Sequence, residues 1–162
     1  MLEKQHLENI EKKVWDVNIL AIYLVRDHPG NKYVTPIIES GLKGEYIPVL
    51  IDILPIRAYW IMEKKWKIEK GEAEASIRDF LEKYDNLLIT KPTKETILNA
   101  FKLSKELRHD IYDTVYVSVA KSTNATTIIT TDTDFKKLCK KTNLKYLNPI
   151  PPKILKKFKN YK

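Results

Sequence analysis

Residues 108–135, RHDIYDTVYVSVAKSTNATTIITTDTDF, have the pattern of a helix, a short connection, a strand and the start of a second helix. Acidic residues stand at both ends of this unit, and they are Asp110, Asp113, Asp132 and Asp134. In a parallel α/β sheet a helix runs antiparallel to its strands, so its start lies at the edge where the strands end. Open α/β sheets have their sites at that edge. The stretch therefore predicts four carboxylates at one functional edge.

The other segments also alternate between strand and helix patterns. Strands are expected at residues 14–16, 46–51, 86–90, 127–130 and 145–147. Helices are expected near 19–24, 31–42, 55–66, 70–84 and 93–107, besides the two helices of the central unit. This alternation predicts an α/β protein, a three-layer α/β/α sandwich around a mainly parallel sheet of about five strands.

The chain of 162 residues suits a single domain over 1–162, with a lead-in at about 1–12 and a basic, Pro- and Lys-rich tail at about 149–162. Three prolines in that tail are expected to end the regular structure: Pro149, Pro151 and Pro152. In the helix at 93–107, Thr93 is the expected N-cap, and an inward face is expected to include Ile97, Ala100, Phe101, Ser104 and Leu107.

The formal net charge is +8, which favours an anionic partner, nucleic acid before membrane. Dispersed lysines of a merely solubilising surface would give the same charge, and both interpretations stay open. Cys139 is the only cysteine, so no intrachain disulfide can form. The sequence shows no signal peptide and no run long enough to span a membrane. We expect a cytoplasmic protein without a membrane partner.

Three acids follow predicted strands, and they are Asp16, Asp52 and Asp132. Gathered carboxylates repel one another, and a divalent cation removes this repulsion. Oxygen ligands suit Mg²⁺ or Mn²⁺ rather than zinc. The sequence has no Cys/His set with zinc spacing, no Gly-rich phosphate loop and no G-x-S-x-G motif. Metal-assisted phosphodiester chemistry is the best use of such a cluster.

Most of these acids also have a purely structural explanation. Asp110 suits an N-cap, Asp113 suits the first turn of a helix, and either Asp132 or Asp134 would cap the last helix. Asn18 is a candidate for both an N-cap and a metal-site helper, and His109 is expected at the surface. Asp16 is harder to explain structurally, because a carboxylate at the end of an apolar strand loses solvation unless it is paired.

Three blocks resemble the PIN domain family: VWDVNIL at 14–20, HDIYDTVYVSVA at 109–120 and IITTDTDF at 128–135. They occur in the family's order and at its separations. The resemblance implies an α/β/α sandwich and an Mg²⁺- or Mn²⁺-dependent ribonuclease, a group that includes the VapC-type toxins of toxin–antitoxin pairs. It also implies metal-binding and catalytic roles for Asp16, Asp113 and Asp132, with Asp134 as an added ligand. Asn18 and Thr131 match the family's polar helpers near the metal, and Asp110 is a further candidate for a supporting role.

One departure concerns the Glu that the family usually places on the helix after the second strand. Here that segment reads DILPIRAYWIM at 52–62, and its charged residues are Asp52 and Arg57. Either Asp52 substitutes for the Glu or the site is short of one carboxylate. Arg57 would then neutralise an acid or hold an RNA phosphate.

The leading interpretation is a metal-dependent endoribonuclease whose partners are RNA, an antitoxin protein and, as in many VapC-type toxins, a second copy of the chain. The alternative is a degenerate PIN domain that binds RNA or a protein without cleaving. A flavodoxin- or receiver-like phosphoacceptor domain would also use Asp at strand ends, but the Lys expected of it is missing.

Overall fold

A computed structural model describes residues 10–161, whose strands form one parallel sheet in the order β3-β2-β1-β4-β5. The strands are β1 (Lys12–Trp15), β2 (Ile47–Ile51), β3 (Leu88–Thr90), β4 (Thr127–Ile129) and β5 (Lys145–Leu147). Most of the predicted lead-in at 1–12 lies outside the described residues. The predicted parallel sheet is confirmed.

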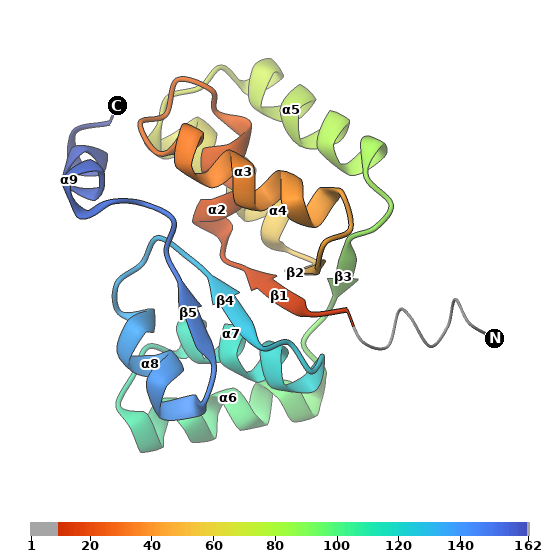
Figure 1. The fold of residues 1–162 in the computed structure, drawn as a ribbon, viewed down its shortest axis with the longest axis vertical. Coiled ribbons are helices and arrows are strands. Elements are labelled where there is room, and N and C mark those ends of the chain that lie inside the picture. The colour runs from red at the N-terminus through yellow and green to blue at the C-terminus, as the bar shows by residue number, and fades with distance from the viewer. Residues whose placement is uncertain (1–9, 162) are drawn as a thin grey trace.

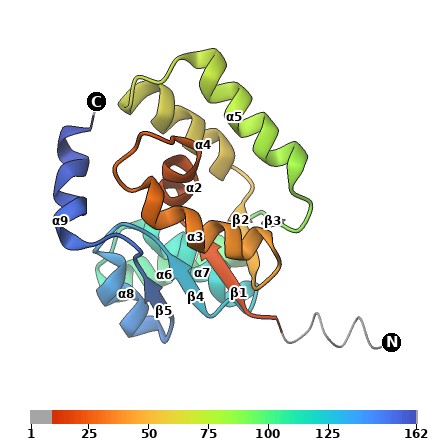
Figure 2. The ribbon, with the colours of Figure 1, turned by 45° about the horizontal axis from the view of Figure 1, so that its top comes forward.

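Helices cover both faces of the sheet (Figures 1 and 2). One face carries α2 (Val17–Leu24), α3 (Asn31–Leu42), α4 (Leu54–Trp60) and α5 (Lys70–Lys83). The other face carries α6 (Lys94–Leu107), α7 (Ile111–Ser122) and α8 (Phe135–Thr142). The expected α-helix at 55–66 changes after Trp60 into a π-helical turn, η1 (Ile61–Lys65). Within residues 10–161, no helix combines the length and the apolar character needed to cross a bilayer.

Strand β1 is the centre of the sheet, with β2 on one side and β4 on the other. Val14 pairs with Val49 of β2 and with Ile128 of β4. After β1 the chain crosses to β2, whereas after β4 it crosses in the opposite direction to β5. The topological switch point therefore lies between β1 and β4, and such points are where open α/β sheets form their sites.

The core around β1 fixes this arrangement. Trp15 is fully buried, and its indole Nε1 donates a hydrogen bond to the hydroxyl of Tyr46 at 3.0 Å. The ring of Tyr46 lies against Gly41, where an added Cβ would come within 2.6 Å of the ring carbon Cζ. Glycine at this position therefore lets the ring of Tyr46 lie directly against α3.

Helix α6 differs from its sequence prediction in the face it buries. Thr93 caps the helix as expected, its Oγ1 accepting from Thr96 N at 3.2 Å. The prediction that Ile97 and Phe101 point inward is wrong, since they are 41% and 59% exposed. Helix α7 packs closely against α6, and Thr114 Oγ1 donates to Ala100 O at 3.0 Å. The buried residues of α6 are Thr96, Ala100 and Leu103, and the small Ala100 permits the close approach of α7.

The C-terminal segment is the second difference. The prolines do not end the regular structure, because α9 (Pro152–Leu155) and the 3₁₀ turn η2 (Lys156–Asn160) follow. Proline is tolerated at the first position of a helix, where its missing N–H would have no partner. The segment then packs on the buried His28, whose ring centroid lies 4.6 Å from that of Phe158 and 4.5 Å from that of Tyr161. The C-terminal segment thus belongs to the packed structure.

Candidate functional site

Three acids from different parts of the chain form one electrostatic cluster at the switch point. Asp16 directly follows β1, Asp113 lies in the first turn of α7, and Asp132 follows β4. The charge of Asp132 raises the pKa of both Asp16 and Asp113, and the charge of Asp16 also raises that of Asp113. Charge effects of this kind require proximity, so the fold brings these predicted acids together.

Asp16 is held by the backbone and by two side chains. It is the N-cap of α2, and its Oδ1 accepts from Val17 N at 2.6 Å. Its Oδ2 accepts from Thr130 Oγ1 at 2.7 Å, and a hydrogen bond with the Tyr116 hydroxyl also lowers its pKa. Burial is nevertheless the largest influence, because only 5% of the residue is exposed, and the net shift of the pKa is upward.

Thr130 links two of the three acids. Its hydroxyl donates to Asp16, and the same oxygen accepts from the backbone N of Asp132 at 3.0 Å. Asp132 Oδ1 in turn accepts from Asp134 N at 2.9 Å, which closes the turn before α8. Thr130 is fully buried. Thr130 was not among the predicted site residues, which included Thr131 instead, although a polar residue at the end of an apolar strand was a usable signal.

Asp113 is the second acid of the cluster whose pKa is raised. Its pKa is raised from 3.8 to about 6, mainly by burial and next by the charge of Asp132, with smaller effects of Asp110 and Asp16 in the same direction. His109 opposes this shift, with its Nδ1 3.3 Å from Asp113 Oδ2. The expectation that His109 lies at the surface is wrong, since only 17% of its side chain is exposed and Nδ1 is buried without a well-aligned hydrogen bond.

The remaining predicted helpers lie around the cluster in different roles. Asp110 caps α7, with its Oδ1 accepting from Tyr112 N at 2.8 Å. Asp134 is exposed and stands at the N-cap of α8 without a side-chain cap bond. Asn18 is half-buried in the first turn of α2, whose cap is another residue. Thr131 is largely buried, and its carbonyl accepts from Asn148 Nδ2 at 3.3 Å.

Asp52 and Arg57, both exposed, line one hollow of about 430 Å³ beside the cluster. The guanidinium carbon of Arg57 lies 5.3 Å from the centre of the Tyr112 ring, within cation–π range. Burial raises the pKa of Tyr116, the tyrosine that interacts with Asp16, and the positive charge of Arg57 partly opposes this rise. Helix α4, with the sequence LPIRAYW, carries no carboxylate, so it does not supply the acid that the family usually has there.

The donors in the cluster are carboxylate and hydroxyl oxygens, which suit Mg²⁺ or Mn²⁺. A divalent cation would also oppose the repulsion that raises the pKa of Asp113. In the part of the chain that the structure describes, no group of three or more His, Cys, Asp or Glu side chains is arranged to hold a metal ion. The donor atoms are thus of the chemical type that binds a divalent cation, although the carboxylates are not arranged around an ion. Binding would have to draw the carboxylates closer to one another.

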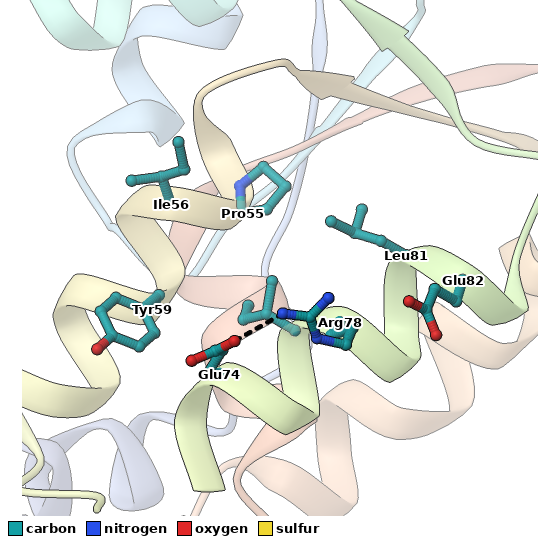
Figure 3. A pocket seen from close by; sticks show the side chains of 8 residues that line it. Pro55, Ile56, Tyr59, Glu74, Arg78, Leu81 and Glu82 are labelled. Carbon is teal, nitrogen blue, oxygen red and sulfur yellow. Dashed lines mark hydrogen bonds and ion pairs between the residues drawn. The ribbon is translucent and has the colours of Figure 1, made fainter. Parts of the chain in front are cut away.

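A second hollow, of about 560 Å³, lies between α4 and α5 (Figure 3). Its apolar lining comes from Pro55, Ile56, Tyr59, Ile77 and Leu81. Three charged residues, Glu74, Arg78 and Glu82, complete the lining. Glu74 Oε1 accepts from Arg78 Nη2 at 2.7 Å within it. This α4–α5 groove is mainly apolar, which suits a protein segment better than a metal or a phosphate.

The sequence matches one family model, and the fold is similar to those of several solved structures. The family model described as PIN domain matches residues 13–141. No curated protein sequence matches the chain significantly. Its fold is similar to that of VapBC2 from Rickettsia felis, solved bound to a promoter DNA fragment, with a TM-score of 0.63, 20% identity and coverage of 85% of this chain and 98% of the other.

Two further structures show the same fold. VapC20 from Mycobacterium tuberculosis, a toxin that cleaves the sarcin–ricin loop, matches with a TM-score of 0.61 and 11% identity over 78% of this chain and 94% of the other. FitAcB from Neisseria gonorrhoeae matches with a TM-score of 0.58 and 16% identity over 85% of this chain and 97% of the other.

Proposed function

Because the chain belongs to the PIN domain family, we propose that it is a metal-dependent endoribonuclease that acts in the cytoplasm. The observation that carries the proposal is the electrostatic coupling of Asp16, Asp113 and Asp132 at the switch point of the sheet. Burial and neighbouring carboxylate charges raise the pKa values of Asp16 and Asp113, which makes their ionised forms costly to fold, and a bound divalent cation would stabilise those forms.

In this proposal Asp16, Asp113 and Asp132 hold Mg²⁺ or Mn²⁺, and Asp134 is an added ligand. When bound, such an ion activates a water and stabilises the leaving oxygen of a phosphodiester. Thr130 keeps Asp16 and the turn at Asp132 in register through its two hydrogen bonds. Asp110 supports the cluster by capping α7. Support by position comes from Asn18, two residues after Asp16, and from Thr131, which directly precedes Asp132.

The net charge of +8 attracts the RNA backbone. We assign Arg57, which lies beside the cluster, to bind this backbone. Asp52 lines the same hollow as Arg57 and would act there as an accessory acid.

The test is cleavage of single-stranded and structured RNA with Mg²⁺, with Mn²⁺ and with EDTA. Activity should require the cation and should fall at least about tenfold in Asp16→Asn, Asp113→Asn and Asp132→Asn, equivalent to about 1.4 kcal/mol of transition-state stabilisation. Asp85→Asn is the matched control, because Asp85 is an exposed acid in the loop before β3. Cleavage that survives EDTA, or all three cluster variants, contradicts the proposal.

A PIN domain that binds RNA without cleaving is the second candidate, favoured by the absence of a carboxylate from α4 and the presence of Arg57 there. RNA binding without cleavage at any Mg²⁺ or Mn²⁺ concentration would select it. Arg57→Glu then provides a further check, since adding an anion in place of a cation should raise the affinity for Mn²⁺ measured by calorimetry.

We assign the α4–α5 groove to an antitoxin partner, which fits as an amphipathic helix in an apolar groove. Ile56 and Leu81 in this groove are 63% and 37% exposed. The test is co-expression with the product of the adjacent reading frame: co-purification should occur with the wild type, be lost in Ile56→Glu and be retained in the control Ile89→Glu on β3. A homodimer is assigned to the exposed apolar side chains of α6, and light scattering should show twice the monomer mass. The side chains are Ile97, Leu98 and Phe101.

A further inference from the structure

The hollow lined by Asp52 and Arg57 lies between the two helical layers. Its walls come from the end of β2, the start of α4, the loop after β3 and the start of α7. Leu54, Pro92 and Val115 give it an apolar floor. Its volume of about 430 Å³ is within the range of small-ligand sites. A flat apolar group with a polar edge would fit this lining.

Tyr112 forms the rim of this hollow with an unusual degree of exposure. The residue is 65% exposed, although its backbone is fixed at the start of α7 by the hydrogen bond from its N to Asp110 Oδ1. The guanidinium of Arg57 lies over the ring at 5.3 Å. An exposed aromatic ring and a planar cation are groups that proteins use to stack nucleobases.

The hollow is also next to the acid cluster. Tyr112 directly precedes Asp113 in α7, and Tyr116, one turn later, lines the hollow and interacts with Asp16. A phosphate held at the cluster would therefore have its neighbouring base within reach of the rim. The net charge of +8 matches a polyanion, and Arg57 supplies a cation at the hollow itself.

We propose that this hollow binds one nucleobase of a single-stranded RNA, with Tyr112 as the stacking platform and Arg57 beside it. The inference rests on the proposed ribonuclease function and adds to it a subsite that positions the strand next to the acids. Stacking is tolerant of base identity, because every base has a π-face, so the subsite holds the strand without selecting a sequence.

The experiment measures fluorescence anisotropy of a labelled ten-nucleotide oligoadenylate in EDTA, where no metal-dependent cleavage occurs. Tyr112→Ala should weaken binding at least about fivefold, and Tyr112→Phe should retain wild-type affinity. Trp60→Ala is the matched control, because Trp60 is an exposed aromatic of α4 with Lys65 Nζ 5.7 Å from its ring centre, outside the hollow. In cleavage assays with Mg²⁺, Tyr112→Ala should act on KM more than on kcat.

Equal affinities of Tyr112→Ala and Trp60→Ala, in a protein that still binds and cleaves RNA, would overturn the subsite and leave the ribonuclease proposal standing. A wild-type protein that neither binds nor cleaves RNA would overturn both. If Tyr112→Ala changes the molecular mass in light scattering but not the affinity for RNA, the hollow is a contact between two copies of the chain and the subsite is rejected.

Discussion

Replacing Asp113 by Asn should stabilise the metal-free protein while it removes the proposed ribonuclease activity. The pKa of Asp113 rises from 3.8 to about 6 on folding, because burial and the charges of Asp132, Asp110 and Asp16 oppose its ionisation. A difference of about two pKa units corresponds to about 3 kcal/mol. The side chain is 19% exposed, so solvent screening reduces the expected gain to about 1–2 kcal/mol.

The gain should depend on pH in a defined direction. Between pH 4 and pH 6 the folded protein binds more protons at Asp113 than the unfolded chain does, so wild-type stability falls as the pH rises through this window. Asn carries no charge at any pH. Its advantage should therefore be complete above about pH 7 and should disappear below about pH 4.

Thermal unfolding in EDTA measures this effect. For a domain of this size, about 1–2 kcal/mol raises Tm by about 2–8 °C at pH 7.5. Asp85→Asn, which removes an exposed charge, should stay within about 0.5 kcal/mol of wild type. Saturating Mg²⁺ should reverse the order, because a ligand at a hundred times its Kd stabilises the wild type by about 2.7 kcal/mol and the variant by less.

An Asp113→Asn protein that is no more stable than wild type in EDTA at pH 7.5 would refute the reasoning about the cluster. It would mean that His109, whose interaction lowers the pKa of Asp113, fully compensates the burial and the neighbouring charges. An unchanged order of stability in Mg²⁺ would refute the assignment of Asp113 as a metal ligand.

Three further outcomes are expected. Thr130→Val should lower stability in urea titrations by about 1.5–3 kcal/mol, since a buried carboxylate loses a donor, and Thr130→Ser should restore most of it; a Ser variant as unstable as Val would contradict this. His28, buried among aromatic rings, has its pKa lowered from 6.5 to about 4, so wild-type stability should fall as the pH falls from 6.5 to 4. His28→Gln should flatten this dependence in denaturant titrations, and an equal slope in both proteins would exclude His28 as its source. RNA affinity should decrease linearly with log salt, by about 0.7 log units per phosphate contacted, whereas a flat profile would mean that the positive charge is only solubilising.

The architecture was largely predictable because it depends on local and repetitive signals. Alternating strand and helix patterns give a parallel sheet almost regardless of the packing details. Caps such as Thr93 and Asp110 act within one helical turn, so they are visible in the sequence. Interactions of this range are encoded by neighbouring residues.

The face of α6 was not predictable from its own sequence. A helix with apolar residues on several sides has more than one candidate inner face, and the partner helix decides between them. Here the close approach of α7 selects Ala100 and leaves Phe101 exposed. The prediction for the C-terminal segment was wrong for a related reason. The segment packs on His28, which lies more than a hundred positions away in the sequence.

For the site, the sequence by itself determined which carboxylates meet, because Asp16 and Asp132 leave strands whose ends share one edge of a parallel sheet. Only the tertiary structure decided what those carboxylates contact. Thr130 joins them and His109 turns inward beside Asp113, whereas Arg57 reaches the ring of Tyr112. Strand order follows from patterns that repeat along the chain, but hydrogen-bond partners and pKa values depend on contacts between distant side chains, which exist only once the layers have packed.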